Sequence, residues 1–492
     1  MSELSIREAR GHGLSTPFIV TVVLAAAAIL WAAPRAAQGD YRDLLTAFII
    51  LQSLWIMLFW RMGVYLFMIY VVLEGFLLNY FYQVPALNVV KDVYVGLLFL
   101  SLAVGLILRR QALFPRLGWV LPFAGFAMVY TAEIFNPNLP NFLVGLVGLR
   151  VTLFYCLLAP VAFWFFDSWD RVIRFFMFMV ALSIPVAAFG IMQYFKGPEW
   201  MISMSPGFQR VVFYAWVPAM EGETGGELPA LRTFSTFVQT GGFSLYLAFL
   251  MLITAGCWGV FRAYWQRMII AAIFLVQFFA LLTTGGRTPV FVFVACVVLW
   301  SFFQRGSLRL TPVLLLLPLL FYVSTMLLGT GFLDRFSTML NPDAVRARNM
   351  PLLTDWFGEA LKTDWTGLGA GYASVASRHV GETPLNGGPV ENGLAKMVFE
   401  AGFPGLVLYV VFLVSFGFTC ARQALRVSDP RLRWFAMPVA AFILVNLLLV
   451  PLGTPFDVSP ANVYLWFFAG FLARAPLLDP GHAAGLVPSA PA

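Results

Sequence analysis

The feature that most constrains the fold is a succession of apolar runs, each about as long as a helix that crosses a lipid bilayer. Hydrophobic residues make up 60% of the 492 residues and charged residues only 11%. A water-soluble protein needs more polar surface than this to cover its core. The sequence therefore predicts an all-α polytopic integral membrane protein.

Runs of roughly 17 to 25 predominantly apolar residues mark the expected membrane spans. We expect 12 to 14 spans and place fourteen, at residues 14–33, 43–60, 63–82, 93–108, 117–135, 142–166, 172–195, 240–261, 268–283, 288–304, 310–330, 403–421, 433–452 and 458–475. The first run follows Arg7 and Arg10, but it lacks a convincing cleavage site, so we expect a retained span rather than a signal peptide.

The distribution of Lys and Arg predicts the orientation in the membrane. If the spans alternate from a cytoplasmic N-terminus, 17 of the 31 Lys and Arg lie on the inner side and the short outer loops hold five. Because positive charges favour the cytoplasmic side, we expect both termini in the cytoplasm. Two long segments, 196–239 and 331–402, are then expected outside. Residues 1–478 would form one transmembrane domain, and 479–492 a disordered cytoplasmic tail.

Charge and cysteine content exclude other classes of protein. The formal net charge is +7, yet the cations lie mostly in short loops between spans, where membrane orientation explains them better than nucleic-acid binding does. The four cysteines show no paired spacing that indicates a disulfide framework or a zinc site.

Three arginines are expected near the outer ends of apolar runs: Arg150, Arg232 and Arg287. A charge in the bilayer interior costs about 2.5 to 3.5 kcal/mol on insertion scales, so each needs a partner. That partner is either lipid head groups, or a buried carboxylate such as Glu74 or Glu133, or a bound anion. Because three arginines share one predicted side, we favour a bound anion.

The long outer segment 331–402 adds two further candidate arginines, Arg346 and Arg348. The planar guanidinium presents a fork of donors that suits phosphate oxygens. Several such forks on one face predict a pyrophosphate ligand that stays attached to a lipid. In the same segment, the glycine string GLGAGY (367–372) indicates a tightly turned backbone, and a phosphate-binding loop is the weaker alternative.

Several short motifs occur in a fixed order along the chain. They are EIFNPNLPNFLVGLVGLRVTLFY (133–155), LRTFSTF (231–237), TTGGRTPVF (283–291), GLGAGY (367–372) and ENGLAKMVFEAGFPGL (391–406). Over roughly residues 117–475, this order resembles the bacterial O-antigen polymerase and O-antigen ligase superfamily. Each motif is moderately specific, and their order is more so.

The resemblance implies a GT-C-like glycosyltransferase embedded in the bacterial inner membrane, with its active site facing the periplasm. The implied donor is a glycan on undecaprenyl pyrophosphate, with no nucleotide sugar, metal or other cofactor. Arg150, Arg232 and Arg287 match the positions of the family's essential arginines. A chain-length regulator and a flippase are the implied protein partners, beside the lipid bilayer.

One departure from the family pattern separates polymerase from ligase. Ligases usually carry a His-Asn pair at the end of the long loop, whereas this chain has Glu391 and Asn392. We therefore place an O-antigen or exopolysaccharide polymerase ahead of a ligase that transfers glycan to lipid A core. Glu391 is the candidate base, with Asn392 in acceptor binding. Both residues also suit the N-terminus of a helix without any catalysis.

Two other outer residues are secondary candidates. His379 is an alternative base, and Glu400 is expected to orient a loop arginine or to accept hydrogen bonds from backbone groups. Two other classes of protein stay open. A transporter would need ionisable groups near the membrane midplane and interrupted helices, and an assembly subunit would need no internal charge.

Overall fold

The computed structural model describes residues 41–84, 86–113, 117–215, 232–303, 322, 326, 342–363, 365–374 and 390–479. Within these residues the regular secondary structure is helical, with no strand. The prediction of an all-α protein is confirmed for this part of the chain.

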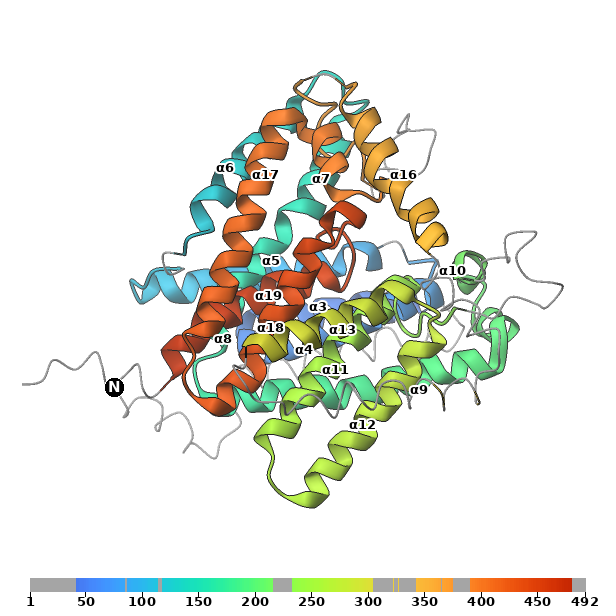
Figure 1. Ribbon diagram of the computed structural model, residues 1–492, viewed down its shortest axis with the longest axis vertical. Coiled ribbons are helices and arrows are strands. Elements are labelled where there is room, and N and C mark those ends of the chain that lie inside the picture. Colours follow the sequence, from blue (N-terminus) through green and yellow to red (C-terminus); the bar gives the residue numbers. More distant parts are fainter. Residues whose placement is uncertain are drawn as a thin grey trace, which may run out of the picture. The chain divides into compact units, whose positions relative to one another are not determined.

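The helices follow one another along the chain as in Figure 1. They are α3 (Arg42–Leu58), α4 (Trp60–Tyr80), α5 (Leu87–Leu108), α6 (Val120–Ala132), η1 (Glu133–Phe135), α7 (Phe142–Thr152), η2 (Phe154–Leu157), α8 (Leu158–Phe165), α9 (Trp169–Met204), α10 (Phe208–Ala215), α11 (Thr240–Val260), α12 (Tyr264–Thr283), α13 (Arg287–Phe303), α16 (Pro342–Ala360), α17 (Gly393–Leu425), α18 (Pro430–Leu448), η5 (Val450–Leu452), α19 (Ala461–Arg474) and η6 (Ala475–Leu478).

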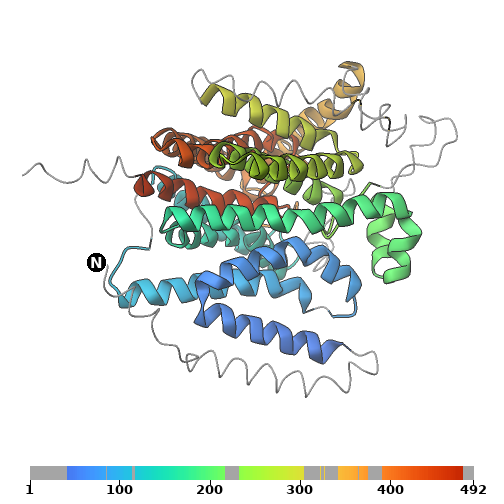
Figure 2. The same ribbon diagram turned by 90° about the horizontal axis from the view of Figure 1, so that it is seen from below.

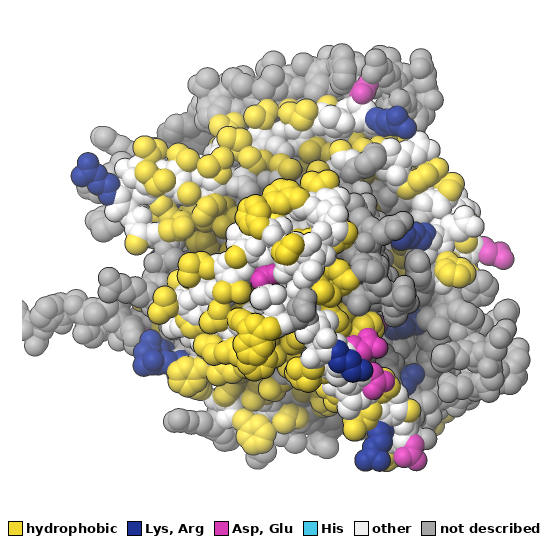
Figure 3. Space-filling model, turned by 90° about the horizontal axis from the view of Figure 1, so that it is seen from above, with side chains coloured by type: hydrophobic (Ala, Val, Ile, Leu, Met, Phe, Trp, Pro, Cys, Tyr) yellow, Lys and Arg dark blue, Asp and Glu magenta, His cyan; other side chains and the backbone are white. Residues whose placement is uncertain are grey.

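Nine helical segments of the described chain are long and apolar enough to cross a membrane. Two expected spans, 14–33 and 310–330, fall outside the described residues apart from Tyr322 and Met326. Each of the other twelve coincides with helical residues. The membrane character and these helix positions are confirmed, and the total of fourteen spans stays a prediction. In the view of Figure 3, hydrophobic side chains cover large areas of the described surface and charged ones are few.

The chain divides into two compact units. The first comprises residues 1–71 and 82–113, and the second comprises 72–81 and 114–492. In the first unit α3 packs against α5, where the hydroxyl of Tyr94 donates to Gln52. Tyr70 on α4 donates to the carbonyl of Leu87 at 2.9 Å. All candidate site residues belong to the second unit.

Aromatic side chains form much of the core of the second unit. Trp466 of α19 packs against Phe123 of α6 and Phe412 of α17, with ring centroids 5.0 and 5.7 Å apart. Figure 1 shows α6 running beside α17. Large rings fill the space between helices and contribute dispersion contacts. The packing brings α6, α17 and α19 together, although they are far apart in the sequence.

Two long helices are interrupted by glycines. Gly197 in α9 has φ 78° and Gly402 in α17 has φ 63°, and a proline follows each within two residues. Figure 2 shows the long α9 with α10 at its end. The break at Gly402 comes one residue before the expected start of a span at 403. The helix itself already begins at Gly393, so the predicted outer segment 331–402 ends in nine residues of helix, counted from Gly393 to Ala401.

The rest of the described outer segment is partly helical. α16 covers 342–360, and a turn-rich loop follows at 365–374. A Cβ at position 402 would lie 2.1 Å from the carbonyl oxygen of Trp365, so only glycine fits there. The loop therefore packs directly on the break in α17.

Candidate functional site

The LRTF segment and the TTGGRT turn lie side by side, although 50 residues separate Thr233 from Thr283. The backbone N–H of Thr233 donates to the carbonyl of Thr283 at 3.4 Å, and the two hydroxyls lie 2.9 Å apart. Nε of Arg232 donates to the carbonyl of Thr284 at 3.4 Å. We call residues 232–233 and 283–287 the arginine corner. It contains two of the three predicted arginines, Arg232 and Arg287, both half-buried.

The turn of the arginine corner is built by two threonines and two glycines. Thr284 donates its hydroxyl to the carbonyl of Leu281 at 2.6 Å and accepts from the N–H of Gly286 at 3.1 Å. Gly285 has φ 59°, which suits glycine because it lacks a Cβ. α13 then begins at Arg287. This side chain is therefore placed by a short, hydrogen-bonded turn at the start of a helix.

The LRTFSTF segment is held by a buried glutamine. Gln193 of α9 donates to the carbonyl of Ser235 at 2.9 Å and accepts from the N–H of Ser235 at 2.8 Å. Thr236 donates its hydroxyl to the carbonyl of Val72 at 2.6 Å. Non-helical backbone inside a helical protein needs such partners for its polar groups. Arg232 thus emerges from a fixed segment rather than from a free loop.

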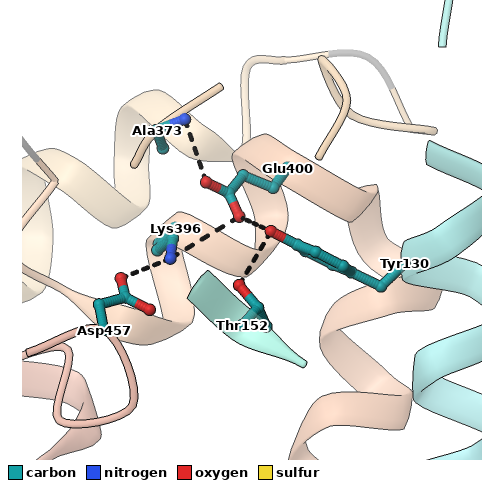
Figure 4. Close-up of polar contacts among 6 residues, drawn as sticks. All are labelled: Tyr130, Thr152, Ala373, Lys396, Glu400 and Asp457. Atoms are coloured by element: carbon teal, nitrogen blue, oxygen red, sulfur yellow. Dashed lines mark hydrogen bonds and ion pairs between the residues drawn. The ribbon is translucent and has the colours of Figure 1, made fainter. Parts of the chain in front are cut away.

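A second group of polar residues is buried at the start of α17. We call Lys396, Glu400 and Asp457 the buried charge cluster (Figure 4). The ammonium of Lys396 pairs with Asp457, and it lies 3.8 Å from Oε2 of Glu400. The side chains of Lys396 and Glu400 are 2% and 0% exposed, which is unusual for charged residues unless they are paired.

Glu400 also connects three elements by hydrogen bonds. Its Oε2 accepts from the hydroxyl of Tyr130 on α6 at 2.5 Å, and its Oε1 accepts from the N–H of Ala373 at 3.2 Å. Thr152 of α7 donates its hydroxyl to Tyr130 at 3.0 Å. Figure 4 shows these side chains pointing toward one another from α6, α7 and α17. One carboxylate therefore joins two helices and the 365–374 loop.

The GLGAGY loop is the tight turn that its glycines predicted. Gly367, Gly369 and Gly371 have φ of 82°, 101° and 79°. A Cβ on Gly148 of α7 would lie 2.3 Å from the N of Gly371, so helix and loop are in backbone contact. Burial raises the pKa of the Tyr372 phenol.

Several amides of this loop already have acceptors within the protein. The N–H of Leu368 donates to the carbonyl of Phe399 at 2.7 Å, and that of Ala370 donates to the carbonyl of Glu133 at 3.2 Å. A phosphate-binding loop would direct these groups at a ligand. The contacts favour a packing role for the loop over phosphate binding.

The segment before α19 connects the two groups of residues. Asp457 belongs to the buried charge cluster, and Ser459 two residues later packs on the first turn of α11. A Cβ on Gly242 would lie 2.5 Å from the carbonyl oxygen of Ser459. Thr240, in the same turn, donates its hydroxyl to the carbonyl of Arg232 at 3.2 Å. The starts of α11 and α17 therefore both contact one short segment, residues 457–459, and the first turn of α11 also contacts the arginine corner.

Other predicted arginines lie elsewhere in the second unit. Arg150 is half-buried in the last turn of α7, two residues after Gly148. Arg346 is exposed on α16. Arg348 belongs to the same helix, but its side chain lies outside the described residues, as does His379. A shared ligand for Arg150 and the arginine corner stays a prediction.

The Glu391-Asn392 pair stands at the start of α17, as expected. Asn392 is buried and caps the helix, since its Oδ1 accepts from the N–H groups of Leu394 and Ala395 at 2.9 and 3.0 Å. The helix-start interpretation is confirmed for Asn392. Glu391 is exposed, beside this cap.

Glu400 was expected either to accept hydrogen bonds from backbone groups or to orient a loop arginine. It does accept a hydrogen bond from a backbone N–H, that of Ala373. Its cation, however, is Lys396 of its own helix rather than a loop arginine. Lys396, Asp457 and Tyr130 were not among the predicted residues. Lys396 and Glu400 stand four residues apart in an apolar helix, and this spacing was the available signal. Asp457 and Tyr130 carry no such local pattern.

The two carboxylates proposed as alternative partners for the arginines also have contacts of other kinds. Glu74 accepts from the hydroxyl of Ser459 at 3.0 Å, and Glu133 accepts from the amide of Asn136 at 2.6 Å. Glu74 therefore lies at the same segment that connects the arginine corner and the buried charge cluster.

In comparisons with known proteins, no protein-family model matches this chain and no curated protein matches it.

Proposed function

We propose that this protein is a periplasm-facing glycosyltransferase of the bacterial inner membrane, which polymerises oligosaccharide repeat units carried on undecaprenyl pyrophosphate. The observation that carries the proposal is the arginine corner. Two segments that resemble motifs of the O-antigen polymerase and ligase superfamily meet there through direct hydrogen bonds, and each contributes one arginine. Two guanidinium groups carried by adjoining segments would suit the two phosphates of a pyrophosphate.

The proposed reaction is a glycosyl transfer. The bond between the anomeric carbon of the donor glycan and the pyrophosphate oxygen breaks, and its electron pair stays on the lipid pyrophosphate. A bond forms between this carbon and a hydroxyl oxygen of the acceptor, whose proton passes to a base. Arg232 and Arg287 would stabilise the leaving group, whose negative charge is greatest as the bond breaks.

Glu391 is the proposed base. It is exposed at the N-terminus of α17, where the Asn392 cap fixes the local backbone. The buried charge cluster begins five residues later and ties α17 to α6, α7 and the 365–374 loop. We assign this cluster a positioning role, because Lys396 and Glu400 are buried and all three members have partners within the protein.

The Glu391-Asn392 pair favours a polymerase over a ligase. A ligase is still the nearest alternative, because both would use the same donor and leaving group. The decisive experiment supplies purified protein with a defined lipid-linked repeat unit, with and without a lipid A core acceptor. A ladder of products supports a polymerase, and a single transfer to the core supports a ligase. If the protein forms no product with either acceptor, the glycosyltransferase proposal is wrong.

Transport is a second candidate, and one observation favours it. A charge cluster buried next to a break in a helix is the arrangement that many transporters use to bind ions or protons. Purified protein in vesicles would then move an anionic solute or protons across the membrane, and the Glu400→Gln variant would not. A glycosyltransferase would show no such flux, and its product formation would not depend on a gradient.

A further inference from the structure

A pocket of about 210 Å³ opens where α11 ends and where α12 and α18 begin. Its lining consists of Gly259, Val260, Arg262, Arg267, Pro430, Arg431 and Trp434. Three of these residues are arginines and none is acidic. In the sequence these arginines served only to predict the inner side of the membrane, and the proposed glycosyl transfer does not use them.

The guanidinium of Arg267 is held in a fixed position. Its Nε donates to the carbonyl of Phe261 at 3.0 Å, and its carbon lies 5.7 Å from the ring centroid of Trp258. Among the described residues, the carbonyl oxygen of Phe261 is the one acceptor of a hydrogen bond from the Arg267 side chain. The remaining N–H groups of the fork are therefore placed for another acceptor.

Arg262 and Arg431 are exposed, and their side chains form no hydrogen bond or ion pair with the part of the chain that the structure describes. The neighbouring carboxylate, Asp429, caps α18 instead. Its Oδ1 accepts from the backbone N–H of Arg431 at 2.7 Å and of Leu432 at 3.4 Å. Three like charges around one pocket repel one another, and the attraction of each to an anion bound between them would offset this repulsion.

The floor of the pocket is a direct contact between two helices. A Cβ on Gly259 would lie 2.0 Å from the indole of Trp434, so this ring packs on the backbone of α11. Next to the lining residues Arg262 and Arg267 in the chain, the first two turns of α12 expose Tyr264, Trp265 and Met268, which are 78%, 63% and 51% exposed and which we call the apolar rim. Such rings favour the boundary between lipid tails and water.

We infer that this pocket binds the phosphate of an anionic phospholipid head group. Arginine forks suit phosphate oxygens, and basic pockets between membrane helices bind anionic lipids at the cytoplasmic side. Free phosphate shares this chemistry, but it would gain nothing from the apolar rim. The inference does not depend on the proposed function.

The test uses the full chain purified in mild detergent, with bound lipid measured by native mass spectrometry. The probes are phosphatidylglycerol and phosphatidylcholine. We expect the wild-type protein to bind phosphatidylglycerol more tightly, and the R262Q/R267Q/R431Q variant to bind it at least about tenfold more weakly. The matched control is R109Q/R422Q/R426Q, which removes the same charge from helix ends outside the pocket and should bind as the wild type does.

Three outcomes would overturn the inference. One is equal loss of binding in both triple variants, and another is equal affinity of the wild type for the two lipids. The third is displacement of the lipid by millimolar inorganic phosphate at constant ionic strength, which would assign the pocket to a soluble anion. If the pocket variant elutes as an aggregate, R262Q alone is measured, since Arg262 is exposed and makes no described side-chain contact. This single variant should still weaken binding about threefold.

Discussion

The buried charge cluster and the arginine corner hold their charges in different surroundings. In the cluster, Lys396 lies between two carboxylates and is almost completely buried. In the corner, Arg232 is half-buried on a non-helical segment, and its Nε donates to the carbonyl oxygen of Thr284. The first arrangement suits a structural role, and the second suits a group that also meets a ligand. Variants can separate stability from activity in these two regions.

The largest effect is expected from Lys396→Met. This change leaves the buried Glu400 and the partly exposed Asp457 without their cation, which should lower the free energy of unfolding by about 3–5 kcal/mol. The measurement is thermal unfolding of the purified protein in detergent. Lys362→Met is the control, because Lys362 is exposed at the end of α16. Equal unfolding midpoints for the two variants would contradict the pairing, and adding Glu400→Gln to Lys396→Met should recover part of the loss.

In the arginine corner, Arg232→Ala and Arg287→Ala should act on activity instead. Each should lower the rate of polymer formation about 100-fold or more, because a donor to the leaving group is lost. Insertion, expression and the unfolding midpoint should stay as in the wild type. Arg210→Ala is the matched control, since Arg210 is exposed in the same predicted outer segment. Lysine at either position should restore little of the rate of polymer formation if the guanidinium must donate two hydrogen bonds to the phosphate. Polymer of normal length in both alanine variants would contradict the pyrophosphate role.

The contact between α7 and the GLGAGY loop gives a smaller effect. Gly148→Ala adds a Cβ that would lie 2.3 Å from the N of Gly371, so we expect a loss of about 1–3 kcal/mol. Gly358→Ala in α16 meets nothing within 4 Å and should stabilise its helix by up to about 1 kcal/mol. The two variants should shift the unfolding midpoint in opposite directions. An unfolding midpoint of Gly148→Ala at or above that of the wild type would show that the loop moves away without cost.

The smallest effect is expected at the start of α17. Asn392→Ala removes the side chain that caps two backbone N–H groups, which should cost about 1 kcal/mol. Asn141→Ala removes the corresponding cap of α7 at a more exposed position, where water can replace the lost bond. We therefore expect a smaller shift in the unfolding midpoint for Asn141→Ala. The reverse order would argue that Asn392 does not act as a cap.

Much of the helical layout follows from the sequence, because hydropathy and span length are local properties. The expected span 240–261 became α11 at 240–260, and the glycine string at 367–371 became a left-handed turn. Contacts between distant parts of the chain were not visible in this way. α17 begins at Gly393, beside the Glu391-Asn392 pair that was expected to start a helix, but no local pattern indicated that its first turns contact the 365–374 loop and Asp457.

Composition and the period of apolar runs by themselves determined a helical membrane protein, because a chain in lipid must satisfy its backbone within each segment. They also singled out Arg232 and Arg287 as charges that need partners. Only the tertiary structure decided that the segments of these two arginines meet, and that Lys396 pairs with Asp457, 61 residues away. Those pairings depend on which helix faces pack together, and such contacts over long sequence distances leave no local pattern in the residues that make them.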